Sequence, residues 1–254
     1  MKAYVGMYYS DTLCVIDISP DVRPAPEKLA LGPEEPWSVV RKGKFFFNDA
    51  GACFQQWLSC ASCHPDSRPD ALNWDLLNDG LGNPKNASSM LNAFNTPPVM
   101  ALGVRADAKT AVRAGFKFIQ FTVVSEEDAQ TVDEYLKSLK PVPSPYLVNG
   151  KLSEAARRGA TVFKKADCDS CHSGPLFTDQ KLHDIGQGKD LDKDKEFDTP
   201  GLVECWRTAP YLYDGRALTM KDLLVKYNAD DSHGTTSDLT PEQINDLAEF
   251  VLSQ

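Results

Sequence analysis

Two five-residue segments carry the clearest chemistry in this sequence. Residues 60–64 are CASCH and residues 168–172 are CDSCH, so both have the pattern C-x-x-C-H. Two thiols at this spacing can add to the two vinyl groups of one porphyrin, and the adjacent histidine can bind the iron as its proximal ligand. The sequence therefore predicts two covalently bound haem c groups. The predicted attachment and proximal residues are Cys60, Cys63 and His64 for the first, and Cys168, Cys171 and His172 for the second.

A zinc site is the main rival interpretation, because two C-x-x-C pairs supply the four thiolates of a structural Cys₄ site. Pairs that share one zinc lie about 15–20 residues apart, whereas Cys63 and Cys168 are separated by more than a hundred residues. A thioredoxin-like redox role would need a βαβ context, which this sequence lacks. Covalent haem also uses the histidine that follows each pair, and we expect it at both motifs.

The ligand on the far side of the second iron has two main candidates. His233 lies in a polar loop beside Gly234, from which it could approach a haem face, and Tyr227 comes shortly before that loop. A strong sixth ligand favours electron transfer, whereas an open position admits peroxide or oxygen. The remaining possible donors are less specific, because a single Met or His usually serves packing: His183, Met90, Met100 and Met220.

The first iron has no histidine available between its own motif and the second one. We expect it to be five-coordinate, or weakly bound by water or Met. Peroxide reacting there would need a distal group that moves a proton between its two oxygens. Glu126 and Gln120 are the candidate catalytic residues, although Glu126 also suits the first turn of a helix as a simple helix-terminal acid.

Composition limits the classes of partner and the compartment. The 254 residues include 27 Lys and Arg against 36 Asp and Glu, a net charge of −9, so nucleic acid is not an expected partner. No apolar run is long enough to cross a bilayer. Because haem c is attached outside the cytoplasm, we expect a periplasmic or exported bacterial protein. Three cysteines lie outside the motifs and leave a disulfide open, with core packing expected for Cys53: Cys14, Cys53 and Cys205.

The elements that must position these residues repeat along the chain. The segment 42–50 precedes the first motif, and a similar segment, 158–166, precedes the second; residues 134–138 and 249–253 also match, each about 115 residues apart. This repetition predicts duplication of one haem domain. Helices are expected over 38–60, with Phe46, Ala50, Cys53, Trp57 and Cys60 on one face, after Ser125 and Ser153 as caps, and after the capping box at Thr240.

The predicted fold is mostly α: two tandem cytochrome c-like haem domains with long loops, preceded by a short β-strand pair. The expected divisions are a terminal β-propeller-like strand fragment (1–20), a Pro-rich connector (21–36), an N-terminal haem domain (37–140), a linker (141–152) and a C-terminal haem domain (153–254). The strand pair resembles the last repeat of a YVTN-type β-propeller, so we expect this chain to be the C-terminal part of a longer exported protein.

From about Val39 onward, the chain resembles the di-haem cytochrome c peroxidases and MauG-type enzymes, and most closely the di-haem domain that follows YVTN propellers. The motifs that carry the resemblance, beside the two C-x-x-C-H segments, are NWDLLNDG (73–80), NTPP (95–98), GPLFTD (174–179), HDIG (183–186) and RTAPYLYDGR (207–216). The resemblance implies that a C-terminal haem passes electrons to a peroxidatic N-terminal haem. Its implied partners are a redox donor protein or a fused propeller, and a small oxidant such as hydrogen peroxide.

The resemblance also implies a calcium ion between the haems, held by Asn95 and by carbonyls near the turn at 198–200; oxygen ligands of this kind suit calcium. The family's distal ligand on the second haem is Met or Tyr, and Tyr227 lies at that place, while the loop around His233 is typical of the propeller-linked relatives. We favour His233. The alternative function is a non-enzymatic electron-transfer module that relays electrons for a fused propeller domain.

Overall fold

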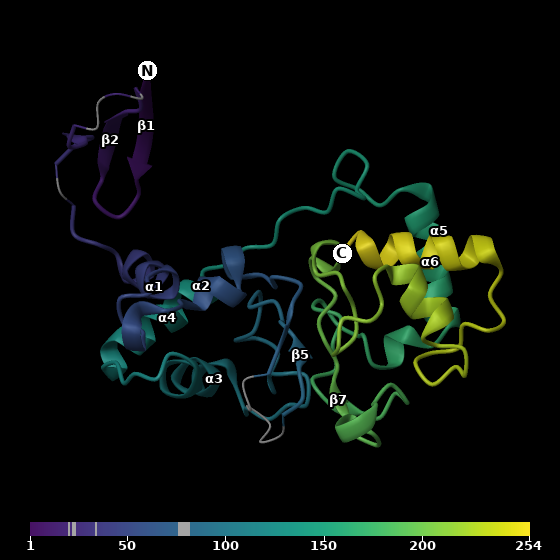
Figure 1. Cartoon of the computed structure of the whole chain (residues 1–254). Coiled ribbons are helices and arrows are strands. Elements are labelled where there is room, and N and C mark those ends of the chain that lie inside the picture. Colours follow the sequence, from purple (N-terminus) through teal and green to yellow (C-terminus); the bar gives the residue numbers. More distant parts are fainter. Residues whose placement is uncertain (20, 22–23, 34, 76–81) are drawn as a thin grey trace.

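The computed structural model describes residues 1–19, 21, 24–33, 35–75 and 82–254. The motif segment 73–80 therefore lies partly outside the described residues. Figure 1 shows two helical lobes side by side, with a small sheet projecting from the first. The six α-helices of the described residues are α1 (Val39–Asn48), α2 (Cys60–Cys63), α3 (Ala108–Ala114), α4 (Glu126–Lys137), α5 (Glu154–Lys165) and α6 (Pro241–Leu252).

Short elements fill the long connections between these helices. Five are 3₁₀ turns: η1 (Phe54–Gln56), η2 (Pro65–Ser67), η4 (Cys168–Ser170), η5 (Asp190–Asp192) and η6 (Cys205–Arg207). Two are π-helical turns, η3 (Gly115–Ile119) and η7 (Asp222–Lys226). Two antiparallel pairs of two-residue strands complete the lobes: β4 (Asn73–Trp74) with β5 (Lys85–Asn86), and β6 (Leu182–His183) with β7 (Phe197–Asp198). The helix-rich character predicted from the sequence is confirmed.

Each lobe has its own apolar core built on one crossed pair of helices. In the first lobe α1 packs on α4, and Phe47, Val132 and Leu136 are buried between them. In the second lobe α5 packs on α6, and Phe163 and Leu247 lie in the core. The two pairs occupy equivalent places in the sequence, which supports the duplication that the repeats predict.

A glycine allows the closest approach in both helix pairs. A Cβ atom at Gly43 of α1 would lie 1.8 Å from the carbonyl oxygen of Thr131 in α4, and one at Gly159 of α5 would lie 1.9 Å from that of Asp246 in α6. Both distances are far below van der Waals contact. The repeated glycine is therefore a packing requirement: it brings the two helices of each lobe together at the same crossing point.

Replacing either glycine with alanine is expected to destabilise its lobe, because the helix backbones must move apart. We expect Gly43→Ala and Gly159→Ala each to lower the free energy of unfolding by about 2–3 kcal/mol, measured by urea denaturation. Gly115→Ala is the matched control, since nothing lies within 4 Å of a Cβ there. Equal effects at Gly43 and Gly115 would contradict the packing argument.

Local sequence signals placed three helix starts correctly. Ser125, Ser153 and Thr240 each accept a hydrogen bond from the backbone N–H three residues later. Thr240 also completes its capping box with Gln243, and Pro241 occupies the first helical position. The helices α4 and α6 each bury one apolar face, which includes Ala129, Val132, Leu136, Ile244, Leu247, Ala248 and Val251.

The expected helix over 38–60 is wrong in its extent. The helix α1 ends at Asn48, and Asp49 follows in an extended conformation. Cys53 is buried, but Trp57 is 55 % exposed and does not continue the predicted face. The apolar spacing persists beyond the true end of the helix, so periodicity alone overestimated its length.

The N-terminal sheet has three strands, β1 (Lys2–Met7), β2 (Thr12–Asp17) and β3 (Glu27–Ala30), in the order β1-β2-β3. The segment 21–36, predicted to be only a connector, thus supplies a strand. The turn between β1 and β2 is fastened to α1: Arg41 donates two hydrogen bonds to the Asp11 carboxylate, and the Tyr9 hydroxyl donates to the Lys44 carbonyl oxygen. The sheet is thereby held at a fixed place on the first lobe.

The two lobes meet along a seam crossed by side-chain to backbone hydrogen bonds. Asn73 Nδ2 donates to the Asp214 carbonyl oxygen at 2.7 Å, and Asn86 Nδ2 donates to that of Pro210 at 2.6 Å. The backbone N–H of Asp198 in β7 donates to the carbonyl oxygen of Ala101 in the first lobe. Within the described part of the chain, no helix has the length and apolar character needed to cross a membrane.

Candidate functional site

The first C-x-x-C-H segment forms one helical turn. Ser59 and Ser62 cap the turn α2 reciprocally, and the His64 backbone N–H donates to the Cys60 carbonyl oxygen at 3.0 Å. The His64 ring places Nδ1 2.9 Å from the Ser88 carbonyl oxygen. A carbonyl can only accept, so Nδ1 carries the proton and Nε2 is free to bind a metal.

The second segment repeats this geometry in the second lobe. The His172 backbone N–H donates to the Cys168 carbonyl oxygen at 2.9 Å, and His172 Nδ1 lies 3.1 Å from the Phe177 carbonyl oxygen. Burial lowers the pKa of both His64 and His172. Each imidazole is therefore held neutral with Nε2 available, as metal ligation requires.

A second imidazole faces His172. The ring centres of His172 and His233 lie 6.1 Å apart. A metal-bound imidazole nitrogen lies about 2 Å from the metal and the ring centre about 1 Å further back, so two imidazoles on opposite sides of one iron have centres about 6 Å apart. Burial, and then the neighbouring His172, lower the pKa of His233 to about 4. The pair has the spacing that a six-coordinate iron needs.

The loop that carries His233 is fixed by one buried amide. Asn228 is 1 % exposed, and its Oδ1 accepts the His233 backbone N–H at 2.7 Å. Its Nδ2 donates to the Gly234 carbonyl oxygen and to the Thr236 hydroxyl oxygen. The ring of Tyr227, the alternative ligand, is instead flanked by the Arg216 guanidinium at 5.5 Å and by Lys226 Nζ at 4.9 Å.

In the first lobe, the whole side-chain amide of Gln120 is buried without a hydrogen-bond partner. It is 1 % exposed, and neither its Nε2 nor its Oε1 has a hydrogen bond. Gln120 directly follows the π-helical turn η3, as Tyr227 directly follows η7, so the two residues occupy equivalent places in the lobes. Buried amides normally have partners, and π-helical turns often occur at functional sites. Gln120 is thus free to bond to a bound ligand.

Glu126, the other candidate catalytic residue, lies on the surface. Its carboxylate accepts hydrogen bonds from Arg113 Nε and Nη2 and faces Lys109 at 3.5 Å. Hydrogen bonding to Arg113 lowers the pKa of Glu126 to about 2. A carboxylate that stays ionised in solvent is poorly suited to carry a proton in a buried distal site, so we do not assign Glu126 a catalytic role.

Asn86 and Asn95, two of the asparagines near the seam, differ in their surroundings. Asn95 is exposed, and its carbonyl oxygen accepts from Gln180 Nε2 of the second lobe at 3.0 Å. Asn86 has a buried Oδ1 with no hydrogen-bond partner, while its Nδ2 lies 2.6 Å from the Pro210 carbonyl oxygen. If the Asn86 amide were turned by 180°, its Oδ1 would point toward the Pro210 carbonyl oxygen. Two oxygens so placed could bind one cation between them. No local pattern separates Asn86 from other loop asparagines.

Two further side chains, Asp179 and His183, gather beside Cys171 of the second motif. Among the described residues, Cys171, Asp179 and His183 form the one group whose ligand atoms lie within 4.8 Å of one another. A thioether bond would consume the Cys171 thiolate. Asp179 already accepts from His183 Nε2 at 2.8 Å. The two C-x-x-C pairs do not come together as a Cys₄ zinc site would require. No two of the seven cysteines form a disulfide in the structure.

The carboxyl of Asp198 lies near that group. Burial, and then the charge of Asp179, raise the pKa of Asp198 to about 7. Since the folded-state pKa exceeds the ordinary value of 3.8, folding favours the protonated acid. The stabilisation is complete below about pH 4 and is lost as the pH rises through 7.

We therefore expect Asp198→Asn, which mimics the protonated acid, to be more stable than the wild type at pH 8, by about 1 kcal/mol after allowance for partial solvent exposure. The two proteins should be nearly equal at pH 4.5. Urea denaturation at both pH values, with a chelator present, measures the difference. Asp184→Asn, at an exposed position, is the control. A gain that is the same at both pH values would rule out the titration.

Other buried polar atoms without partners fit a charged group between the lobes. Trp206 Nε1 and Arg216 Nε are buried donors with no acceptor. The carboxylates of a porphyrin are acceptors of the required kind. The Arg113 guanidinium is instead bonded to the Glu126 and Asp133 carboxylates.

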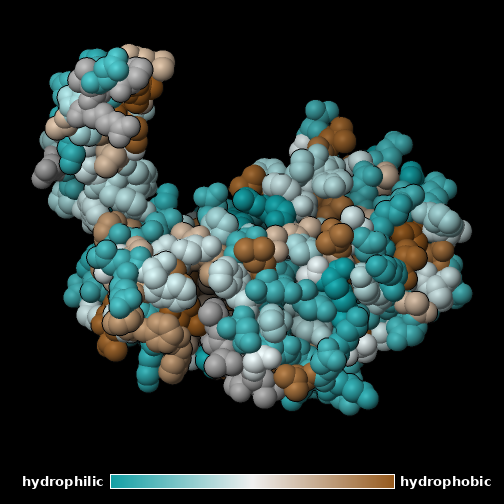
Figure 2. All heavy atoms as spheres, in the orientation of Figure 1, coloured by the Kyte–Doolittle hydropathy of each residue, from teal (hydrophilic) through white to brown (hydrophobic). Residues whose placement is uncertain are grey.

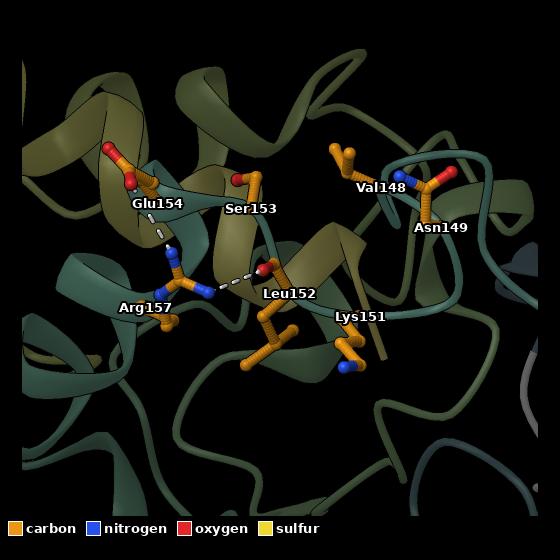
Figure 3. Close-up of a pocket in the computed structure, with 7 residues that line it drawn as sticks. All are labelled: Val148, Asn149, Lys151, Leu152, Ser153, Glu154 and Arg157. Carbon is orange, nitrogen blue, oxygen red and sulfur yellow. Dashed lines mark hydrogen bonds and ion pairs between the residues drawn. The ribbon is translucent and has the colours of Figure 1, made fainter.

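One surface pocket lies away from both motifs. It lies at the start of α5 and is lined by residues 148–149 and 151–154 together with Arg157 (Figure 3). Arg157 forms an ion pair with Glu154 and donates to the Leu152 carbonyl oxygen. Neither C-x-x-C-H motif contributes to this pocket, so it is not the candidate site.

Comparison with known proteins points to one group. The chain is 30 % identical to hydrazine synthase subunit gamma of Kuenenia stuttgartiensis, over 84 % of this chain and 76 % of the relative. It is 27 % identical to the methylamine utilization protein MauG of Methylophilus methylotrophus, over 92 % and 84 % of the two chains. The structure of the di-haem peroxidase BthA of Burkholderia thailandensis matches with a TM-score of 0.64 at 16 % identity, over 87 % of this chain and 86 % of that one. No protein-family model matches the chain.

Proposed function

Because this chain belongs to the family that contains MauG, the di-haem cytochrome c peroxidases and hydrazine synthase subunit gamma, we propose that it is a di-haem c-type oxidoreductase. Electrons enter at the His172 site and pass to the His64 site. Hydrogen peroxide, or a similar small oxidant, is reduced there. Export to the periplasm, where haem c is attached, belongs to the same proposal.

The difference between the two sites carries this proposal. His172 has a second imidazole, His233, with ring centres 6.1 Å apart. The first lobe offers no such histidine; instead it has Gln120, whose buried amide has no hydrogen-bond partner. An iron with two imidazoles is suited to electron transfer, and one with an open position is suited to binding an oxidant. The division of roles follows from these two environments.

The residues of the chain would act as follows. Each pair of thiols would hold one haem, which supplies one-electron redox chemistry when bound. The carbonyl oxygens of Ser88 and Phe177 keep the protons of His64 and His172 on Nδ1 and orient both rings. Gln120 would donate to one oxygen of a bound oxidant and accept a hydrogen bond from the other. An amide does not exchange protons readily, so Gln120 orients the oxidant and water completes the proton transfer.

Calcium between the lobes is part of the proposal, at Asn86 rather than at Asn95. The unpaired buried Oδ1 of Asn86 and the nearby Pro210 carbonyl oxygen are oxygen ligands of the kind that calcium takes. The exposed Asn95 has no such buried oxygen.

The propeller association rests on the N-terminal sheet. Along β1 and β2 apolar residues occupy both faces: Val5 pairs with Cys14 on one face, and Tyr4 pairs with Val15 on the other. Figure 2 shows this sheet standing apart from the lobes with apolar atoms on its surface. A sheet with two apolar faces suits a layer between neighbouring sheets, as in a propeller blade. The alternative function is a non-enzymatic module that relays electrons for such a propeller domain.

Optical and EPR spectra of the haem-loaded protein, with and without peroxide, test the proposal. We expect one high-spin iron that reacts with peroxide and one low-spin iron that does not. Two low-spin irons, neither reacting with peroxide, would support the electron relay instead. An intact mass without haem would exclude both functions.

A further inference from the structure

A buried, bidentate ion pair between Arg68 and Glu204 joins the two lobes at the seam, where Lys85 and Asp192 form another ion pair. Arg68 lies four residues after His64, in the first lobe, and Glu204 lies in the second. Arg68 Nε donates to Glu204 Oε2 at 2.7 Å, and Arg68 Nη2 donates to Glu204 Oε1 at 2.8 Å. The side chains are 6 % and 1 % exposed. Two parallel hydrogen bonds of this kind fix both distance and orientation.

The same pair also holds the linker between the lobes and the end of the chain. Arg68 Nη2 donates to the Lys140 carbonyl oxygen, and Glu204 Oε1 accepts the Val142 backbone N–H. The Glu204 backbone N–H donates to the Gln254 carbonyl oxygen, after the end of α6. Glu204 adopts a left-handed conformation with φ 63°, which is rare for a residue with a side chain. Several contacts thus converge on one strained position.

Stability alone does not explain such a pair. Taking two charges out of water costs about as much as their attraction returns, so an apolar pair of similar volume would serve stability equally well. An apolar pair does not fix the relative orientation of the two segments that carry it. A bidentate ion pair permits one relative placement of the segments that carry it, here the segment just after the first motif and the turn η6 in the second lobe.

The turn η6 also carries an aromatic residue of interest. Arg207 lies 3.8 Å from Glu204 Oε2, and its guanidinium covers the Trp206 ring at 5.6 Å. The Trp206 indole N–H is buried without an acceptor. Glu204 therefore orients both Arg68 of the first lobe and the residues that follow it in the second.

We propose that Arg68 and Glu204 are positioning residues for electron transfer between the two haem sites, an inference that rests on the proposed function. They hold the His64 segment and η6 at a fixed separation across the seam. The step they serve moves one electron: the iron of the second site loses it, the iron of the first site gains it, and no bond is made or broken. Neither residue touches the reacting groups.

The test is the rate of electron redistribution between the haems after partial reduction of the loaded protein, followed by the optical bands of each haem. The variant is Arg68→Met with Glu204→Gln, which removes both charges and keeps an acceptor for Val142. We expect the rate to fall by about tenfold or more, because small displacements of reacting groups have large effects. The distance between the irons, measured by pulsed EPR, should become broader, while the spectrum of each haem is unchanged.

Arg158→Met with Asp246→Asn is the matched control. That pair has the same bidentate geometry, at 2.7 and 2.8 Å, but lies wholly within the second lobe. Its redistribution rate should stay within about twofold of the wild-type rate. Arg68→Lys, which keeps the charge and loses the second hydrogen bond, gives an intermediate rate and serves if the double variant does not fold.

An unchanged rate and an unchanged distance distribution in the Arg68 variants would overturn the positioning role while leaving the proposed function intact. If the wild type itself shows no electron redistribution between two attached haems, the proposed function fails and the positioning role fails with it. Equal slowing in the control pair would show a general loss of stability and would also overturn the inference.

Discussion

Replacing Gln120 with leucine is expected to slow the reaction of the reduced protein with hydrogen peroxide by about a hundredfold or more. The Gln120 amide is 1 % exposed and unpaired in the first lobe, and in the proposed function an oxidant bound in that lobe would be its hydrogen-bond partner. Leucine has nearly the same volume and cannot form a hydrogen bond. Stopped-flow measurement of haem oxidation at several peroxide concentrations gives the second-order rate constant.

The matched control is Gln130→Leu on the exposed side of α4, where the Gln130 amide donates only to Glu126. This change should leave the rate within about twofold. Gln120→Glu keeps a hydrogen-bonding side chain and should retain more activity than Gln120→Leu. If Gln120→Leu reacts with peroxide as fast as the wild type while both haems remain attached, the distal role of Gln120 is excluded.

Stability offers an independent readout for the same variant. A buried amide without partners carries an unmet desolvation cost, so leucine should raise the free energy of unfolding of the haem-free protein by about 1 kcal/mol. A residue that serves function often lowers the stability of the fold, so Gln120→Leu should gain stability while it loses peroxide reactivity. A loss of both stability and peroxide reactivity would point instead to a packing role for Gln120.

Local signals in the sequence predicted much of this architecture. The helix starts at Ser125, Ser153 and Thr240 could be predicted because a capping side chain bonds to the backbone N–H three residues later. The two similar helix pairs could be anticipated because a glycine stands at the same place of each repeated segment, Gly43 and Gly159. The end of α1 could not be predicted, because the helical spacing of apolar residues continues through Trp57, beyond the last helical hydrogen bond.

The long-range contacts of the site could not be predicted in the same way. The approach of His233 to His172 spans 61 residues and depends on the buried amide of Asn228, which has no local signature. The unpaired atoms of Gln120 and Asn86 appear only when burial is known. Pairing of Arg68 with Glu204 joins residues 136 apart in sequence, and no periodicity encodes such a contact.

Tyr227 and His233 illustrate the limit of a family resemblance. Both were candidates for the second iron, and the structure places the imidazole of His233 beside His172 while Arg216 and Lys226 flank the Tyr227 ring. Position in the chain could not distinguish them, since they are only six residues apart. The loop geometry set by Asn228 is what favours His233.

Replacing His233 with alanine is therefore expected to open the second iron. If His233 is the ligand, as we propose, its imidazole occupies that position in the wild type and an external ligand must compete with it. If the position is free about 1 % of the time, removing the competitor should tighten binding of cyanide or imidazole by about a hundredfold. Optical titration of the loaded protein measures the affinity, and EPR should show the low-spin signal of the second site replaced by a high-spin one.

The comparison that decides the assignment is Tyr227→Phe, which keeps the ring and its contacts with Arg216 and Lys226 but removes the hydroxyl. It should leave the low-spin signal and the ligand affinity unchanged. Asn228→Ala should give a partial effect, because the His233 loop loses the amide that anchors it while the imidazole remains. If Tyr227→Phe abolishes the low-spin signal and His233→Ala does not, the tyrosine is the ligand, and the 6.1 Å approach of the two imidazoles is a packing contact.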